Sequence, residues 1–91
     1  MASRNPDDPQ LKKWRRTVKK RDRHKCQFPG CRAKTKLQAH HIYRWADNIS
    51  KRYDITNGIT LCKNHHKTVT GNEAAYVALF TEIVSKKKHK I

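Results

Sequence analysis

Three cysteines and one histidine stand in two pairs whose spacing suits a single metal ion. Cys26 and Cys31 enclose four residues that include a Pro-Gly turn, and Cys62 precedes His65 by three positions. Zinc accepts four ligands and binds a Cys3His set readily, so the two pairs together predict one tetrahedral site. The alternative is three buried thiols that act as small hydrophobic side chains. It fits less well, because each cysteine has polar or basic neighbours in the sequence.

The number of cysteines and the small apolar content point the same way. Three cysteines cannot all pair as disulfides, so we expect a reducing environment and metal binding. Only 35% of the 91 residues are hydrophobic, which leaves a thin core for one small domain. We therefore expect a bound metal to supply part of the folding free energy.

Two adjacent histidines form a second group of residues that could take part in a reaction. His40 and His41 lie in a predicted strand, residues 37–42, where successive side chains point to opposite faces. One imidazole can then bind an ion while its neighbour accepts a proton. An exposed pair without any role remains an alternative for this pattern alone. Helical geometry also leaves open which histidine joins Cys62 on the structural metal, because Cys62 can share a helical face with either His65 or His66.

The elements that would position these residues form one domain, residues 9–85, with residues 1–8 flexible and a disordered basic tail at 86–91. Asp8 is predicted to cap a helix that starts at Pro9 and ends near Asp22, with an apolar stripe of Leu11, Trp14 and Val18. A last helix, residues 73–85, is predicted to follow an Asn72 cap. Its predicted buried side consists of Ala75, Val77, Leu79, Phe80, Ile83 and Val84.

Between these helices the sequence predicts a tight knuckle at 26–31, a strand at 37–42 and an irregular surface loop at 43–55. Asn57-Gly58 is typical of a turn. Residues 59–69 are interpreted as a helix, or as a short turn that leads into one, ended by Gly71.

A large positive charge limits the partners. The chain has 22 Lys and Arg against 7 Asp and Glu, a formal charge of +15. This excess predicts a polyanionic partner, first nucleic acid and second an acidic membrane surface. No apolar run approaches the roughly 20 residues that span a bilayer, and the charged N-terminus is unlike a signal peptide. We therefore expect a soluble intracellular protein that does not enter a membrane.

The order of the motifs resembles the HNH nuclease family, also called the ββα-metal or His-Me finger family. The matching segments are Leu37-Gln-Ala-His40-His41-Ile42 and Asn57-Gly-Ile-Thr-Leu-Cys62-Lys-Asn-His65-His66-Lys67. The resemblance spans about residues 26–67, extends weakly over both flanking helices, and is strongest to small zinc-containing members often encoded by phages. It implies an α+β fold, a small ββα-metal domain with a zinc knuckle, flanked by N- and C-terminal helices.

The resemblance also implies a role for each residue. His40 and His66 match the two ligands of a catalytic ion, His41 matches the general base, and Asn57 matches the residue that orients the base and its loop. Thr70 stands where some members have a further histidine. This departure favours a loosely held, exchangeable ion such as Mg²⁺, Mn²⁺ or Ni²⁺ over tightly bound Zn²⁺. The structural zinc set is matched by Cys26, Cys31, Cys62 and His65.

These features predict a DNA endonuclease that nicks or cuts duplex DNA with little sequence preference and contacts mainly the backbone. The seven acidic residues are scattered, so a carboxylate cluster for a two-metal mechanism is missing from the sequence. The resemblance adds phage packaging proteins as partners and the cytoplasm of a bacterial host as the location. The predicted DNA-contacting residues are Arg15, Arg16, Lys19, Lys20, Arg44, Arg52 and Lys67.

Two other functions were weighed against the nuclease. A zinc-stabilised DNA-binding module without activity fits the charge and the zinc ligands, but it has no need of the His40, His41, Asn57 and His66 set. An RNA-binding zinc protein would be expected to carry exposed aromatic residues on a sheet, which the sequence lacks. Tyr43 and Trp45 can stack on DNA, although a core role is the more common one for aromatic residues in so small a domain.

Overall fold

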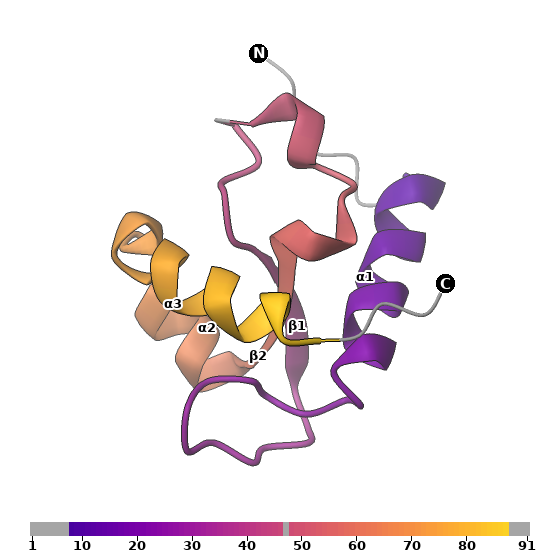
Figure 1. Cartoon of the computed structure of the whole chain (residues 1–91). Helices are drawn as coiled ribbons and strands as arrows, with labels where there is room; N and C mark the ends of the chain where they lie inside the picture. Colours follow the sequence, from indigo (N-terminus) through magenta and orange to yellow (C-terminus); the bar gives the residue numbers. More distant parts are fainter. Residues whose placement is uncertain (1–7, 47, 88–91) are drawn as a thin grey trace.

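An antiparallel pair of strands lies between helices in the computed structural model, which describes residues 8–46 and 48–87. The described elements, in chain order, are α1 Pro9–Arg21, β1 Leu37–His41, the 3-10 turns Ile49–Lys51 and Ile55–Asn57, β2 Gly58–Cys62, α2 Lys63–Val69 and α3 Glu73–Ser85. β1 pairs with β2 from Leu37 opposite Cys62 to His41 opposite Gly58. Figure 1 shows these strands at the centre of the molecule, and the predicted α+β class is confirmed.

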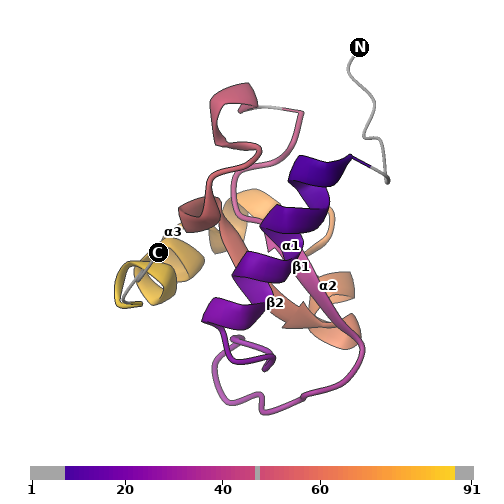
Figure 2. The same ribbon diagram turned by 90° about the vertical axis from the view of Figure 1, so that its right-hand side faces the viewer.

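Helices cover both faces of the sheet. Figure 2 shows α1 crossing in front of the strands, with α2 and α3 beyond them. The α1 side holds one apolar cluster of buried residues, which consists of Leu11, Trp14, Val18 and Trp45. The opposite side holds a second cluster around Ile42, Ile59, Leu61, Val69, Phe80 and Val84, with the cysteines Cys26 and Cys62 at its edge. The core is therefore divided into two small parts by the sheet.

The interpretation of residues 59–69 as helical was wrong for its first part, which is strand β2. All five residues of β2 are buried, because helices cover both of its faces. Ile59 and Leu61 contribute to the cluster shared with α3, whereas Gly58 contacts α1. A strand buried on both faces has no polar-apolar alternation, so the pattern that normally identifies a strand is missing. Helix α2 begins only at Lys63.

The flanking helices agree with the sequence in extent more than in detail. The Asp8 carboxylate accepts a hydrogen bond from the Gln10 amide at 2.9 Å, as a cap should, and α3 has its predicted bounds. Asn72 does not cap α3 with its side chain, which instead donates to the Thr68 carbonyl. Ala75 and Leu79 were predicted to be buried and are exposed, because only Phe80 and Val84 of α3 lie fully in the core.

The predicted flexibility of 1–8 and disorder of 86–91 fall largely outside the described residues, which begin at Asp8 and end at Lys87. Within the described part of the chain, no helix combines the length and the apolar character needed to cross a bilayer.

We predict that Gly58→Ala destabilises the fold through overpacking. A Cβ atom at Gly58 would lie 2.5 Å from Cγ2 of Val18 and 2.7 Å from Cζ2 of Trp14, two buried atoms of α1. Overpacking of this kind typically costs about 1–3 kcal/mol. In a domain of this size each kcal/mol lowers Tm by about 4–8 °C, which a thermal melt followed by circular dichroism would detect.

Val18→Ala provides the matched background, because it removes the methyl group nearest to the added Cβ atom. The cost of Gly58→Ala should be smaller in that background than in the parent protein. An equal cost in both backgrounds would contradict close packing of α1 on β2.

Candidate functional site

The knuckle, the end of β2 and the first turn of α2 bring four metal-binding side chains together. The ligand atoms of Cys26, Cys31, Cys62 and His65 all lie within 4.8 Å of one another. Nδ1 of His65 is 3.3 Å from Sγ of Cys62 and 3.6 Å from Sγ of Cys26, and the sulfurs of Cys31 and Cys62 are 4.0 Å apart. A tetrahedral zinc ion, with bonds of about 2.3 Å to sulfur and about 2.1 Å to nitrogen, holds its ligand atoms roughly 3.5–3.8 Å apart. The four residues therefore fit one zinc ion.

Local packing orients the His65 ring within this cluster. Phe28, in the knuckle, stacks on the imidazole with ring centres 4.1 Å apart and planes 2° from parallel. The amide of Cys31 donates to the Phe28 carbonyl at 2.9 Å, and Gly30 has a φ of +81°, which glycine adopts readily. Phe28 also meets the edge of Phe80 in α3. The tight turn thus joins the metal ligands to the α3 side of the core.

The protein environment affects the thiols of the cluster in different ways. Burial raises the pKa of the Cys26 thiol to about 11. The backbone amide of His65 lowers the pKa of Cys62 by donating a hydrogen bond to its sulfur. A bound cation outweighs the cost of burying Cys26 as a thiolate, because a thiol that coordinates a metal is deprotonated. The donor set therefore fits a metal, whose charge would compensate for the burial of the Cys26 thiolate.

A second pair of side chains suited to a metal consists of His40 and His66. β1 turns His40 towards α2 and α3, where its ring centre is 5.6 Å from that of His66 and 5.9 Å from that of Phe80. An ion bonded at about 2.1 Å to an imidazole nitrogen lies roughly 3.3 Å from the ring centre, so two rings on one ion have centres roughly 5–6 Å apart. The separation of His40 and His66 matches that requirement.

A carboxylate at the start of α3, that of Glu73, interacts electrostatically with one member of this pair, His40. Hydrogen bonding by its own backbone amide is the main cause that lowers the pKa of Glu73, and the Gly71 amide and the positive charges of Arg44 and His40 contribute. Glu73 is therefore within electrostatic reach of His40. The sequence pattern missed it, because its only signal was an acidic residue in the first turn of a helix.

His41 points to the opposite face of β1, towards α1. It is 7% exposed, and its ring lies flat on Trp14 with centres 3.9 Å apart and planes 7° from parallel. Nε2 of His41 is 2.9 Å from the Arg52 carbonyl oxygen. A carbonyl oxygen can only accept, so Nε2 carries the proton and Nδ1 has the lone pair of the neutral ring. The contact therefore selects one tautomer.

Asn57 closes the long loop that supplies the Arg52 carbonyl. Its Oδ1 accepts from the Tyr43 amide at 2.7 Å, and its Nδ2 donates to the carbonyls of Tyr43 and Lys51, both at 3.1 Å. Asn57 is buried, with 4% exposed. One side chain thus joins the first residues of the loop to the residue before Arg52. The orienting role of Asn57 in catalysis stays a prediction.

Helix α1 also binds this loop directly. Nε1 of Trp14 donates to the Asp54 carbonyl at 2.8 Å, and the hydroxyl of Tyr53 donates to the Asp8 carboxylate. The sequence had assigned Trp14 only to an apolar stripe. Its contacts with His41 and with the loop depend on segments that are far apart in the chain, so no local pattern could have indicated them.

Arg21 differs from the prediction for the basic helix. The basic residues of this helix all have one sign, which predicts a phosphate-facing surface made of Lys12, Lys13, Arg15, Arg16, Lys19, Lys20 and Arg21. That prediction is wrong for Arg21, because its side chain is only 7% exposed and pairs with the buried carboxylate of Asp22. The adjacent opposite charges at the end of the predicted helix were the signal that could have identified this pair.

The other predicted DNA contacts occupy different environments. Arg16, Lys20, Arg44 and Lys67 are exposed, and Arg15 and Lys19 are half-buried. Arg52 is half-buried, because its guanidinium covers the Trp45 ring at 4.5 Å and its Nε donates to the Trp45 carbonyl. Trp45 itself is 9% exposed and part of the α1-side core. Their contacts with DNA stay a prediction.

Comparison with known families agrees with this geometry. Residues 26–68 match the family model described as HNH endonuclease. The match starts at the first cysteine of the metal cluster and includes both strands and nearly all of α2. Neither curated proteins nor solved structures give a match to the chain.

We predict that His65→Ala and His66→Ala have different effects, although the two residues are adjacent in α2. His65→Ala should release zinc and lower Tm, because His65 lies among the three cysteines and structural zinc contributes folding free energy directly. His66→Ala should retain zinc and melt near the parent temperature. Elemental analysis of each purified variant, together with a thermal melt, measures both quantities.

If His66→Ala loses zinc and His65→Ala keeps it, His66 and not His65 binds the structural zinc, and the assignment of the two histidines is wrong. Absence of tightly bound zinc from the freshly purified parent protein would refute the structural site itself.

Proposed function

We propose that the protein is a metal-dependent endonuclease that hydrolyses phosphodiester bonds of duplex DNA with little sequence preference. The observation that carries this proposal is the imidazole of His41, whose tautomer is selected by the Arg52 carbonyl. It lies next in sequence to His40, whose ring is paired with that of His66 at a distance suited to one ion. A protein that only binds DNA needs neither arrangement. The family match of residues 26–68 supports the same activity.

His41 would act as the general base. A neutral imidazole has an ordinary pKa near about 6.5, so at neutral pH it can accept a proton from water. The proton moves from the water to Nδ1, while Nε2 keeps its own proton and continues to donate it to the Arg52 carbonyl oxygen. The water oxygen forms a bond to phosphorus and the bond from phosphorus to the 3′-oxygen breaks. The leaving oxygen takes a proton from solvent, which gives a 3′-hydroxyl and a 5′-phosphate.

Stacking on Trp14 would help to keep His41 in place during the reaction. The flat contact at 3.9 Å covers one face of the imidazole, and the edge of Trp45 approaches it with ring centres 5.5 Å apart. These contacts restrict rotation of the ring about its side-chain bonds. A base that is already oriented loses little entropy when the reacting groups meet.

His40 and His66 would hold the catalytic ion, with Glu73 close enough to add negative charge to the site. A divalent cation bound there would act as a Lewis acid that stabilises the charge of the phosphate and of the leaving oxygen. Two imidazoles are few ligands, which favours an exchangeable ion such as Mg²⁺, Mn²⁺ or Ni²⁺ over tightly bound Zn²⁺. Zinc would occupy the separate cluster of Cys26, Cys31, Cys62 and His65.

DNA would bind through the basic surface of α1 and the residues beside the histidines. Leu11, Trp14 and Val18 face the core, and the exposed side of α1 carries the charged residues Lys12, Lys13, Arg16 and Lys20. Contacts with phosphates require no particular base sequence, which agrees with low specificity. Duplex DNA is the partner that we propose. Phage packaging proteins and a bacterial cytoplasm are proposed from the resemblance alone, and the domain bounds 9–85 are proposed from the predicted ends of the flanking helices.

We predict that His41→Asn abolishes metal-dependent cleavage of supercoiled plasmid. Asparagine cannot titrate near neutral pH, and loss of a general base lowers the rate on the order of 10²–10⁴-fold. The matched control is His24→Asn, which removes an exposed histidine after α1 whose φ of +53° asparagine tolerates. The control should cleave at the parent rate, and both variants should retain zinc.

Cleavage by His41→Asn at the parent rate would refute the assignment of the base. A parent protein that binds plasmid but does not cut it with Mg²⁺, Mn²⁺, Ni²⁺ or Zn²⁺ would favour the alternative, a zinc-stabilised DNA-binding module without activity.

We also predict that DNA affinity falls steeply with salt. Each phosphate contact releases counterions and adds about −0.9 to the slope of log K against log salt concentration. Lys20→Gln, on the exposed face of α1, should reduce the magnitude of that slope by about one contact. Lys34→Gln, an exposed change of the same chemistry near the knuckle, serves as the control and should leave it unchanged. Fluorescence anisotropy with a labelled duplex measures both, and a flat salt response of the parent would contradict electrostatic binding.

A further inference from the structure

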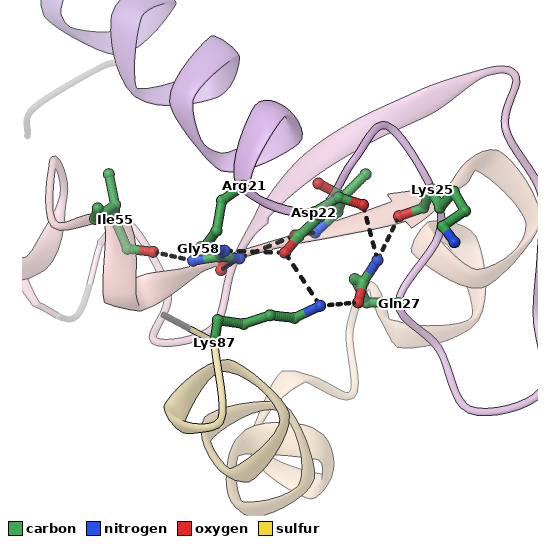
Figure 3. A network of polar contacts seen from close by, with 8 residues as sticks. Arg21, Asp22, Lys25, Gln27, Ile55, Gly58 and Lys87 are labelled. Carbon is green, nitrogen blue, oxygen red and sulfur yellow. Dashed lines mark hydrogen bonds and ion pairs between the residues drawn. The ribbon is translucent and has the colours of Figure 1, made fainter. Parts of the chain in front are cut away.

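A buried carboxylate at the end of α1 organises a polar network that reaches both strand β2 and the knuckle. The side chain of Asp22 has no exposed surface. Its oxygens accept from Nε and Nη2 of Arg21 and from the Thr60 amide, each at 2.9 Å. Lys87 lies 3.8 Å from the same carboxylate and donates to the Gln27 side chain at 2.6 Å. Figure 3 shows these groups converging at the point where α1 meets β2.

The guanidinium of Arg21 has a second set of contacts, all with backbone carbonyls. Nη1 donates to the Ile55 carbonyl and Nη2 donates to the Gly58 carbonyl, both at 2.7 Å (Figure 3). These two carbonyls stand on either side of Asn57 in the chain. Asp22 therefore holds the guanidinium in one orientation, and the guanidinium in turn holds the backbone on both sides of Asn57.

Asn57 connects this network to the proposed base. Its side chain binds the backbone of Tyr43 and the carbonyl of Lys51. Arg52 follows Lys51, and its carbonyl accepts the hydrogen bond from Nε2 of His41. A displacement of Asn57 would therefore move the acceptor that selects the tautomer and the direction of the His41 ring. Each link between Arg21 and His41 is a hydrogen bond or a peptide bond.

We propose that Arg21, oriented by Asp22, is a positioning residue for the general base: it fixes the backbone around Asn57 and thereby the Arg52 carbonyl that holds His41. The inference rests on the proposed nuclease function. Arg21 touches neither the substrate nor the proposed ion, and its effect passes through Asn57. A contact chain of this kind requires a direct measurement of coupling, since proximity alone does not establish it.

Arginine suits this position better than lysine. A guanidinium is a planar fork that can bind a carboxylate with two N–H groups and still direct other N–H groups to carbonyls. The ammonium group of lysine can keep an ion pair with Asp22, but as a point charge it cannot also reach both carbonyls in their present places. Arg21→Lys therefore keeps the buried charge pair and removes the hydrogen bonds that position residues 55–58.

Arg21→Lys is the test, with Arg23→Lys as the matched control. Arg23 is exposed and lies two residues further along the chain. We expect Arg21→Lys to lower kcat on the order of 10- to 100-fold at saturating plasmid, since small misplacements of a reacting group have effects of that size. KM and zinc content should stay close to the parent values. The control should match the parent in all three quantities.

Nuclear magnetic resonance supplies a readout that does not depend on activity. The Nε2 proton of His41 and the side-chain amide protons of Asn57 are buried and hydrogen-bonded in the parent. In Arg21→Lys they should exchange with solvent at least about tenfold faster, while the core amides of β2 exchange at the parent rate. Unchanged exchange and unchanged kcat would overturn the proposal. Uniformly faster exchange of all core amides would also overturn it, because it indicates a general loss of stability.

Two further results separate the proposal from related failures. If the parent does not cleave DNA, the nuclease function fails, while the exchange of the His41 proton still decides whether Arg21 positions that ring. If Arg21→Lys does not fold, Asp22→Asn takes its place, because the amide keeps the shape of the carboxylate but holds the guanidinium by one acceptor oxygen. A smaller loss of kcat in that variant, with faster exchange of the His41 proton, would support the proposal. Parent values for both would refute it.

Discussion

In the described part of the chain, the fold depends on attaching helices α1, α2 and α3 to the two-stranded sheet of β1 and β2. Such a sheet offers little apolar area, and an isolated pair of strands is marginally stable in water. Here the sheet separates the buried apolar residues into two small clusters, one beneath α1 and one beneath α2 and α3. Apolar packing on this scale leaves little margin against conformational entropy. The remaining stability has to come from specific attachments, and the structure contains two of them.

One attachment is the metal cluster and the other is the Arg21–Asp22 network. Cys26 and Cys31 join the knuckle to the end of β2 and the start of α2 through Cys62 and His65. The buried carboxylate of Asp22 joins α1 to the middle of β2 through the Thr60 amide. Burying an ion pair costs desolvation free energy, which is best compensated when further hydrogen bonds satisfy both groups. Here the Thr60 amide and the carbonyls of Ile55 and Gly58 provide them. Both attachments involve β2, through Cys62 and Thr60, and neither depends on a side chain of β1.

The same attachments position the proposed chemistry. His40 and His41 are adjacent on β1, so the strand turns one towards α2 and the other towards α1. The ion-binding pair is therefore completed by a residue of α2, and the base is supported by residues of α1 and the loop. The two imidazoles therefore lie on opposite faces of the strand, so the proposed base and the proposed ion site have different surroundings. Polar contacts with the backbone of the long loop between the strands hold its two ends together and attach it to α1.

The sequence predicted those features that depend on local spacing. The two cysteine pairs, the bounds of α3 and the Asp8 cap all follow from residues close together in the chain. Strand β2 was missed because burial on both faces removes the alternation by which a strand is identified. The stacking of Trp14 on His41 and the role of Arg21 were missed for a different reason. Both depend on contacts between α1 and segments more than 25 positions away, and Arg21 resembles its basic neighbours in composition.

The central claim is that the chain holds two different ions, a structural one on the thiols and an exchangeable one between His40 and His66. Crystals grown with Mn²⁺ and a short DNA duplex, measured at wavelengths on either side of the zinc and manganese absorption edges, would locate both by anomalous scattering. The account predicts zinc among Cys26, Cys31, Cys62 and His65, and manganese between the rings of His40 and His66 beside a phosphate. Zinc among the thiols with manganese bound elsewhere, or with DNA bound and no ion between those two rings, would contradict it.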